Sequence, residues 1–520
     1  MSKARFVSCL LVLLLLVSAL PAYAATEPFV QLRILYGSSG FILPDPNNPI
    51  REAIQEKTGI DVLMEPWYYT GDDEFNTRLN MWAASGDLPF DVFLGGGGTY
   101  AISLYNMMGE SGLLRNLEPD ILSSEAMTKF VAHTFPKYRD GVDGSVYMYP
   151  FHLNSAEMYG NLRDAGIATR IDWLSDLDLD EPDSPEAFYD MLVKMKDAYG
   201  IAPLSTSDGN FYQLAIQFIG LDGMNFWEKD ADGTYRIAMF NKFDKLIDYA
   251  VFMNKLWNEG LMDQESFTQK PEQLVQKLST GKAGVSTFVR HSVQATINDI
   301  LWGSDPEALL AFIPAFPADG VKAGNNVITN WGGGLCVVNA KIPTEKMEAL
   351  VKYWDFVLSK DGTILTFMGV EGEQWEYDEN GKAAFLPDFI TQYPTENERQ
   401  EFGLWHYQAP ACSWFRIDQY AAPKPEYSRK DYAYSMANCN DTIELDDLTY
   451  GVVAGDEEQL RLPSINDSWK QTIVKAIMAS SEAECRAVME AFPKTLDSLG
   501  YDLICKERTE LTKTLEDAVK

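Results

Sequence analysis

The chain has 520 residues, a formal net charge of −33 at pH 7 and a hydrophobic fraction of 46%, which is typical of a globular protein. The strong negative charge opposes binding to nucleic acid or to anionic lipid, because those surfaces attract Lys and Arg. It also weakly disfavours a polyanionic ligand. The length is sufficient for two domains.

The first 24 residues have the three parts of an export signal. Lys3 and Arg5 form a basic start, residues 10–20 are apolar, and residues 22–24, Ala-Tyr-Ala, match the small-x-small cleavage pattern. The apolar run is too short to span a bilayer comfortably, and no comparable run follows it. We therefore expect cleavage near Ala24 and a periplasmic or extracellular mature protein. The cleavage region contains no cysteine, so it does not predict a lipid anchor.

Three predicted strands near the N-terminus alternate with helices. The strands are residues 29–36, 60–64 and 91–94, and the helices are residues 49–57 and 75–84. Gly59 and Gly86 directly follow the helices, as left-handed C-caps do. This alternation predicts a parallel sheet, and right-handed crossovers bring the carboxyl ends of its strands to one edge.

The residues that follow these strands form a candidate ligand site, because ligands of open α/β sheets bind beyond the carboxyl ends of the strands. Gly95 to Gly98 would leave bare backbone N–H groups there, although four glycines are also consistent with an ordinary surface turn. The residues expected at this edge are Tyr36, Ser38, Glu65, Trp67, Tyr69, Thr99 and Tyr100.

Several short motifs, in their order along the chain, resemble those of the extracellular solute-binding proteins of bacterial ABC importers, family 1, the group that contains maltose-binding protein. The motifs are ASGDLP at 84–89, RIDWL at 170–174, GKAG at 281–284 and GVEG at 369–372. The resemblance covers nearly all of the chain after the signal. It implies an α/β, two-lobe periplasmic-binding-protein-like fold of type II, in which each lobe is a mainly parallel sheet flanked by helices and hinge crossovers join the lobes.

The resemblance also divides the chain into lobes. Residues 25–152 and 333–385 are expected in the N-terminal lobe, and residues 153–332 and 386–520 in the C-terminal lobe. The glycine-interrupted strand at residues 327–335 suits a hinge, since hinge residues absorb changes in φ and ψ. Further helices are expected at residues 185–198, 243–258, 345–358, 467–479 and 483–499.

The many aromatic residues, together with the resemblance, predict a carbohydrate ligand. Aromatic rings cover the apolar faces of a pyranose, while amide, carboxylate and Arg groups bind its hydroxyls. The candidates for stacking are Trp67, Tyr100, Phe211, Trp331, Trp405 and Trp414, and the polar candidates are Ser38, Glu65, Asn210, Arg290 and Glu371. Trp331 and Phe211 rank highest, because they lie beside positions that relatives use. Core packing is expected instead for Trp82, Trp173 and Trp354, and pairing with Asp172 for Arg170.

No catalytic or metal-binding motif is found in the sequence. The four histidines are far apart and form no HExxH or triad signature. Residues 197–203 are too poor in carboxylates for the calcium loop of some relatives, and residues 230–233 are expected to form a turn. We therefore expect no cofactor and no metal ion. A glycosidase pair of carboxylates has no sequence signature and stays open as an alternative.

Five cysteines lie beyond the signal, and an odd number leaves at least one thiol free. Two disulfides are conceivable in an oxidising compartment, Cys412 with Cys439 and Cys485 with Cys505. Buried free thiols are the alternative.

The predicted function is that of an extracytoplasmic substrate-binding component of an ABC importer. Two closing lobes would capture a carbohydrate, an oligosaccharide in view of the aromatics, and present the closed form to the transmembrane subunits of a permease. The expected protein is a monomer with no nucleic-acid partner and no enzymatic activity. The alternatives are a secreted carbohydrate-active enzyme, a binding module that feeds a membrane sensor, or capture of a peptide.

Overall fold

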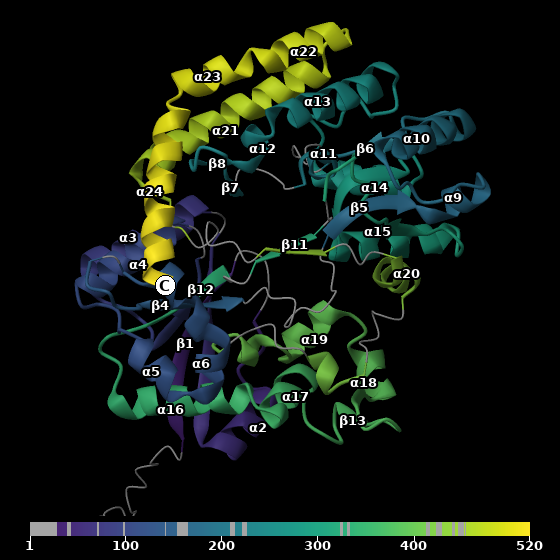
Figure 1. Cartoon of the computed structure of the whole chain (residues 1–520). Helices are drawn as coiled ribbons and strands as arrows, with labels where there is room; N and C mark the ends of the chain where they lie inside the picture. The colour runs from purple at the N-terminus through teal and green to yellow at the C-terminus, as the bar shows by residue number, and fades with distance from the viewer. Residues whose placement is uncertain are drawn as a thin grey trace, which may run out of the picture.

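The computed structural model describes residues 29–38, 43–69, 72–96, 99–140, 142–152, 165–207, 214–220, 226–322, 326–329, 333–411, 417–422, 429–438, 442–445, 452 and 454–519. Two main sheets, each flanked by helices, lie in different parts of the molecule (Figure 1). This arrangement confirms the expected mixed α/β class.

The first sheet contains five strands in the order β2-β1-β3-β12-β4. Their bounds are Ile60–Tyr68 for β2, Val30–Ser38 for β1, Val92–Leu94 for β3, Gly333–Val338 for β12 and Met148–His152 for β4. β1 runs parallel to β2 and β3, as the sequence predicts, whereas β12 runs antiparallel to β3 and β4.

The alternation of side chains along these strands places a core on each face of the first sheet. Leu32 and Ile34 of β1 pack on one face with α2 (Pro49–Thr58) and α16 (Thr344–Val357), whereas Leu35 packs on the other face with α3 (Asp72–Ser85) and α4 (Thr99–Glu110). α2 begins at Asn48, whose side chain accepts hydrogen bonds from two backbone N–H groups, and ends at Gly59 with a φ of 74°.

The second sheet has the strand order β10-β5-β9-β6. The bounds are Leu310–Phe312 for β10, Ala165–Arg170 for β5, Val285–Arg290 for β9 and Leu204–Ser205 for β6. β6 runs parallel to β9, whereas β5 is antiparallel to both of its neighbours. Its core includes side chains from α9 (Ile171–Asp176), α10 (Pro185–Tyr199) and α13 (Phe243–Asn258), and α15 (His291–Ser304) contributes to a second cluster.

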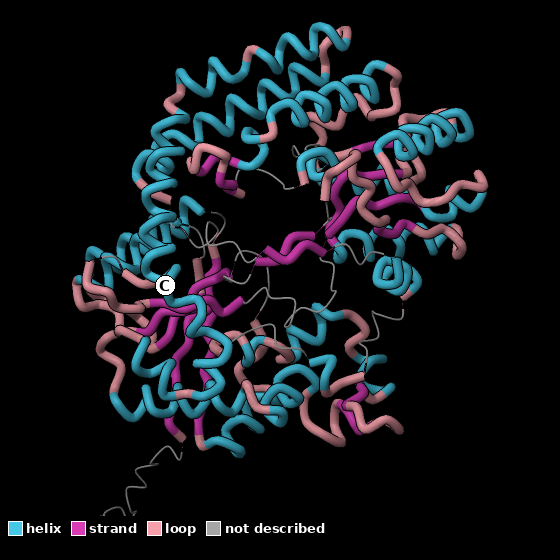
Figure 2. Tube along the Cα trace, in the orientation of Figure 1, coloured by secondary structure: helices cyan, strands magenta, loops and turns pink. Residues whose placement is uncertain are grey.

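A two-stranded parallel ribbon lies between the two main sheets (Figures 1 and 2). It consists of β11 (Asn326–Thr329) and β15 (Thr442–Leu445). The glycine-interrupted strand expected at residues 327–335 is therefore two strands, since β11 belongs to the ribbon and β12 to the first sheet. A segment of the chain that leaves the second sheet thus enters the first sheet by way of this ribbon.

The remaining elements surround these sheets. Around the first sheet are α5 (Glu118–Ser123), α6 (Glu125–Val131), η1 (Ala132–Thr134), α7 (Phe135–Tyr138), α17 (Lys360–Met368), β13 (Trp375–Tyr377), β14 (Ala383–Phe385), α18 (Pro387–Gln392), α19 (Glu396–Phe402), η3 (His406–Gln408) and η4 (Ile417–Gln419). Around the second are α11 (Ile216–Ile219), β7 (Trp227–Lys229), β8 (Tyr235–Ile237), α12 (Ala238–Asn241), α14 (Pro271–Ser279) and α20 (Lys430–Asn438).

The C-terminal region differs from the prediction. Two helices were expected after residue 467, but the structure has α21 (Asp456–Ile477), α22 (Glu482–Glu490), α23 (Phe492–Ser498) and α24 (Tyr501–Val519). α21 begins earlier because it continues through Pro463. α24 packs against α21 and β8 and also contacts α7, which joins the last helix to the first-sheet side of the molecule (Figure 1).

The segment between β14 and residue 411 packs with the first sheet. Leu404, Tyr407 and Ala411 belong to the same buried cluster as β1. Trp354 of α16 donates its indole N–H to the carbonyl of Pro410 at 2.9 Å. The sequence analysis placed a boundary between the lobes at residue 386. The helical segment after this residue instead buries its apolar side chains in the core of the first sheet.

Three cysteines of the described residues, Cys336, Cys485 and Cys505, are buried free thiols. The possible bridge between Cys485 and Cys505 is therefore not formed, and Cys412 and Cys439 lie outside the described residues. Within the described part of the chain, no helix is long and apolar enough to cross a membrane.

Candidate functional site

The carboxyl ends of β1, β2 and β3 meet at one edge of the first sheet. The register pairs Ser38 with Tyr68 and Tyr36 with Leu94. β4 ends at the same edge, where His152 pairs with Gly333 at the start of β12. Five segments of the chain therefore begin or end at this edge, as strand-end reasoning predicts.

Gly95 and Gly96, the two described glycines after β3, are required by close packing. A Cβ at Gly95 would lie 2.6 Å from the Phe93 ring, and one at Gly96, where φ is +77°, would lie 2.9 Å from the Cβ of Ala101. The backbone of this turn is fixed to β12, since Gly95 donates to the carbonyl of Leu335 and Leu335 donates to that of Gly96, each at 2.8 Å. The turn thus brings rigid backbone to the edge.

Side chains of the second sheet form a corresponding edge. Arg290 ends β9 and pairs with Ala165 at the start of β5, and its side chain is exposed. Behind this edge lies a buried polar network in which Thr287 donates to the hydroxyl of Thr206 at 2.9 Å and Gln269 donates to that of Ser205 at 2.7 Å. The Thr287–Thr206 bond links β9 to the end of β6, and Gln269 holds Ser205 in β6, so these strand ends are held in one arrangement.

Two predicted residues remain at these edges. Tyr100 lies in the first turn of α4, is 44% exposed, and accepts a hydrogen bond on its hydroxyl from Asn80 at 2.6 Å. Arg290 lies at the edge of the second sheet. Ser38 also ends β1 at the first edge, although its side chain lies outside what the structure describes.

Trp67 is a core residue, so the prediction that it stacks on a ligand is wrong. Its side chain is only 5% exposed and stacks on Trp82, with ring centroids 4.9 Å apart. Phe75 and Phe93 contact its edge, and the Arg78 guanidinium lies 4.2 Å from its ring centroid. The alternation along β2 turns Trp67 toward α3 and leaves the next residue, Tyr68, outward.

Tyr68 is the aromatic residue that the sequence analysis missed at this edge. Its side chain is 51% exposed at the last position of β2. Its carbonyl accepts from Arg78 at 2.6 Å, which fixes the strand end. A two-residue period counted from Val62 and Met64 places Tyr68 on their face of the sheet and Trp67 on the opposite face, and the strand keeps this period, since Val62 and Met64 belong to one core cluster and Trp67 to the other. Because both faces of β2 are covered along most of the strand, the period alone does not predict that Pro66 and Tyr68, near its end, are exposed.

Three other predicted residues are engaged elsewhere. Glu65 accepts a charge-assisted hydrogen bond from Arg33 across β1 and β2. Glu371 is exposed in a turn that forms a bridge with Trp375. Trp405 is half-buried against Phe367, with a ring-centroid distance of 5.8 Å. The Glu65 and Trp405 side chains thus pack against neighbours of their own, and the bridge of Glu371 is made by its backbone.

The remaining candidates, Asn210, Phe211, Trp331 and Trp414, lie outside the described residues.

The core assignments are confirmed for Trp173 and Trp354, which are buried, and for Trp82, which packs on Trp67. The expected turn at residues 230–233 is confirmed as the connection between β7 and β8. The described part of the chain contains no cluster of three or more His, Cys, Asp or Glu side chains that could hold a metal ion.

A layer of aromatic rings lies behind the first edge. The ring of Tyr36 lies 5.8 Å from that of Phe151 and 6.2 Å from that of His406, measured between centroids. Burial raises the pKa of Tyr36 and lowers the pKa of His406 to about 4. Both side chains are therefore neutral at pH 7, and this aromatic layer presents no charge to the edge above it.

Comparison with known proteins identifies the family. The model of the bacterial extracellular solute-binding proteins matches residues 44–363, which is more than half of the chain. The chain belongs to this family. The solute-binding protein is 31% identical over 144 residues to an uncharacterized protein in the butB 5′ region of Niallia circulans, and 22% identical over 353 residues to lipoprotein LipO of Bacillus subtilis (strain 168). It spans 54% and 65% of their lengths, and the matches cover 27% and 64% of its own.

Solved structures share the fold of this solute-binding protein over nearly its whole length. An extracellular solute-binding protein from Bifidobacterium longum subsp. infantis has a TM-score of 0.67 at 15% identity and covers 94% of this chain and 99% of its own. The alginate-binding protein AlgQ2 without calcium ion has a TM-score of 0.62 at 18% identity, and the match covers 95% of this chain and 99% of AlgQ2. FusA of S. pneumoniae in complex with kestose has a TM-score of 0.62 at 17% identity, with 94% and 100% covered.

Proposed function

We propose that this solute-binding protein is the substrate-capturing component of an ABC importer and that it takes a carbohydrate, specifically an oligosaccharide, between two closing lobes. The observation that carries the proposal is the pair of sheets on either side of the β11–β15 ribbon, with Tyr68 and Tyr100 exposed at the edge of the first sheet and Arg290 exposed at the edge of the second. Two bodies joined by such a ribbon can hinge toward each other with little change inside either body.

The proposed lobes follow the packing of the sheets. Residues 25–152 and 333–411 form the N-terminal lobe, and residues 153–332 with the C-terminal helices form the other. A ligand that contacts both lobes stabilises the closed form by its differential affinity for that form. Closure then supplies the shape that permease transmembrane subunits recognise, and the protein needs no catalytic group and no partner copy to produce it.

The proposed ligand contacts combine the exposed residues of the two edges with the candidates that lie outside the described residues. They are Ser38, Tyr68, Tyr100, Asn210, Phe211, Arg290, Trp331 and Trp414. A saccharide is supported by FusA, which is in complex with kestose, and by AlgQ2, which is named an alginate-binding protein. The net charge of −33 favours a neutral sugar over an acidic one.

We further propose that the protein is exported, with cleavage near Ala24, and that it acts outside the cytoplasm. Membership of the extracellular solute-binding family supports this location. The cleavage site is tested by N-terminal sequencing of the secreted protein. A mature N-terminus far from Ala25 would contradict it.

The test of function is a thermal-shift screen of the mature protein across neutral and acidic oligosaccharides. A neutral oligosaccharide should raise the melting temperature, and the shift should be lost in Trp331→Ala but kept in Trp82→Phe, since Trp82 is partly buried and packs against the core. Small-angle scattering should report a more compact protein with the ligand. A shift lost only in the Trp82 variant would contradict the proposed site.

Incubation of the protein with the same oligosaccharides tests the absence of catalysis. The chains should remain intact by mass analysis over hours. Cleavage at catalytic rates would replace the importer proposal with that of a secreted carbohydrate-active enzyme.

A further inference from the structure

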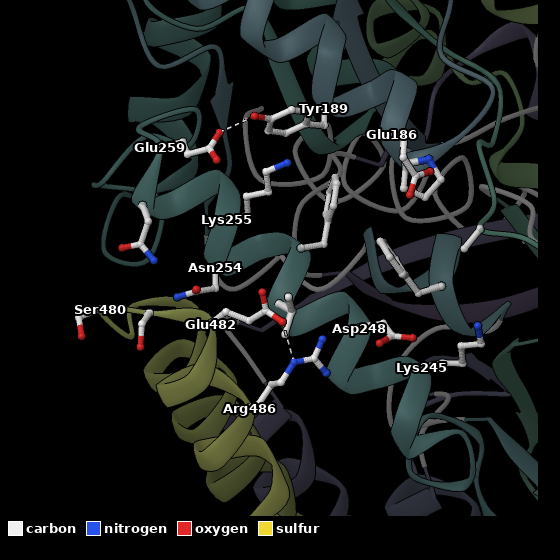
Figure 3. Close-up of a pocket in the computed structure, with 17 residues that line it drawn as sticks. Glu186, Tyr189, Lys245, Asp248, Asn254, Lys255, Glu259, Ser480, Glu482 and Arg486 are labelled. Atoms are coloured by element: carbon white, nitrogen blue, oxygen red, sulfur yellow. Dashed lines mark hydrogen bonds and ion pairs between the residues drawn. The ribbon is translucent and has the colours of Figure 1, made fainter.

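A cavity of about 840 Å³ opens on the second-sheet side of the molecule, away from the edges described above. Most of its lining comes from helices: α13 runs between α10 and the start of α22 (Figure 3), and Phe218 of α11 and Ala318 add to the lining. This volume lies within the range of small-molecule sites, which is roughly 300–1,000 Å³. The cavity is therefore large enough for a ligand of several rings.

One face of α13 supplies the length of this cavity. Lys245, Asp248, Phe252, Lys255 and Glu259 follow one another at three- and four-residue intervals and all line it. Such spacing places side chains in a row along a helix, here over about 21 Å at 1.5 Å per residue. A ligand along this row would be extended rather than compact.

The lining of the cavity has no dominant charge. Its cations are Lys245, Lys255 and Arg486. Its carboxylates are Glu186, Asp248, Glu259 and Glu482. Cationic and carboxylate side chains thus occur in nearly equal number, so the lining attracts neither a polyanion nor a cation strongly. The favoured ligand is neutral and has groups that both donate and accept hydrogen bonds, as sugar hydroxyls do.

Apolar surface lies among these polar groups. Phe252 and Val251 of α13, Phe218 of α11 and Ala318 all line the cavity, and the rings of Phe218 and Phe252 are 5.4 Å apart between centroids. Polar groups around an aromatic patch match the two surfaces of a pyranose, its apolar face and its rim of hydroxyls.

The walls are held by contacts that the ligand need not make. Tyr189 donates its hydroxyl hydrogen to Glu259 at 2.6 Å, and the Lys255 ammonium lies 3.4 Å from the centroid of the Tyr189 ring (Figure 3). Asn254 donates to the carbonyls of Ile477 at 3.0 Å and Ala479 at 2.7 Å, which fixes the end of α21 beside α13. A preformed wall lowers the entropy lost on binding.

We propose that this cavity is a second binding site, for a neutral oligosaccharide, separate from the site between the sheets. A peptide is disfavoured, because a wall made of helices offers no unpaired strand edge to an extended backbone and the cavity lacks a continuous apolar groove for a helix. This proposal does not depend on the importer function. A saccharide held here would keep a longer polymer near the protein while one end is captured elsewhere.

The test uses maltotriose and cellotriose as probes of the full mature protein, with lysine acetylation as a local readout. Each sugar should slow acetylation of Lys255 and Lys245, measured by peptide mass spectrometry, and leave exposed Lys470 of α21 unaffected. The protection should persist in Trp331→Ala, which tests the other site. Loss of protection in that variant, or none at millimolar sugar, would overturn the proposal.

Exposed side chains allow variants that leave the fold intact. Asp248→Ala and Lys245→Ala, at two exposed lining positions, should each weaken binding of the protecting sugar about tenfold in calorimetric titration, the effect of removing one hydrogen bond to a charged group. Lys470→Ala should not change it. Equal affinity for the sugar in all three variants would contradict the site. Protection of the cavity lysines by an extended polar peptide, with none by the sugars, would contradict it as well.

Discussion

Arg170 and Asp172 form a buried ion pair where β5 passes into α9. The Nε of Arg170 donates to Asp172 Oδ1 at 2.8 Å, a second guanidinium nitrogen donates to Oδ2, and the Arg170 guanidinium lies 4.9 Å from the Trp173 ring centroid. Asp172 also accepts from the backbone N–H of Leu309 at 3.0 Å. The pairing of Arg170 with Asp172 is as expected from the sequence. Through Leu309, the pair also joins the turn after β5 to the start of β10.

Replacement of Asp172 by alanine should destabilise the protein by about 3 kcal/mol, because the buried Arg170 guanidinium loses its counter-charge. Denaturation by urea, followed by fluorescence, measures this change. The double variant Arg170→Met with Asp172→Leu should recover most of the loss, since it removes both charges. A double variant as unstable as the single one would show that the pair is not the cause.

Gly284 is required by the packing of Trp173. A Cβ at residue 284 would overlap the Trp173 indole, which is buried in the core of the second sheet. Gly284→Ala should therefore cost roughly 1–3 kcal/mol through overpacking. The matched control is Gly303 in α15, where a Cβ would meet nothing within 4 Å. Gly303→Ala should be neutral or stabilising by up to about 1 kcal/mol, and the two melting temperatures together check the prediction.

Trp67 and Tyr68 should respond in opposite ways to replacement by alanine. Trp67→Ala should lower the free energy of unfolding by about 3–5 kcal/mol, because it leaves a cavity among stacked rings. Tyr68→Ala should change stability by less than about 0.5 kcal/mol, as exposed positions do. It should instead weaken binding of the stabilising oligosaccharide by about tenfold, as loss of an aromatic contact does. Unchanged affinity in Tyr68→Ala would remove this residue from the proposed site.

Acid should destabilise the protein through His406. Burial lowers the pKa of His406 from 6.5 to about 4, so the folded state binds fewer protons than the unfolded state between these values. The free energy of unfolding that depends on neutral His406 is fully present above pH 6.5. It decreases as the pH falls toward 4, by up to about 3 kcal/mol. Unfolding of the protein and of His406→Gln should be compared from pH 7.5 to 4. The variant should lose less stability on acidification, and parallel curves would refute the assignment.

The local predictions that succeeded depend on neighbours in sequence. α13 begins and ends where the apolar period does, and α10 starts at Ser184, whose hydroxyl accepts from the N–H of Ala187 at 3.2 Å. Those that failed depend on distant partners. Trp67 and Trp405 were both expected to stack on a ligand, yet the rings that pack on them come from other segments of the chain, Trp82 of α3 and Phe367 of α17.

The sequence by itself determined the class of fold, the three parallel strands around β1 and the family, because periodicity, glycine caps and short motifs are local properties of the chain. Only the tertiary structure decided that Trp67 is covered while Tyr68 is exposed, that residues 404–411 pack on the first sheet, and that α10, α13 and α22 enclose a cavity. The physical reason is that burial results from contacts between segments far apart in sequence, and no local pattern specifies which segment covers a given side chain.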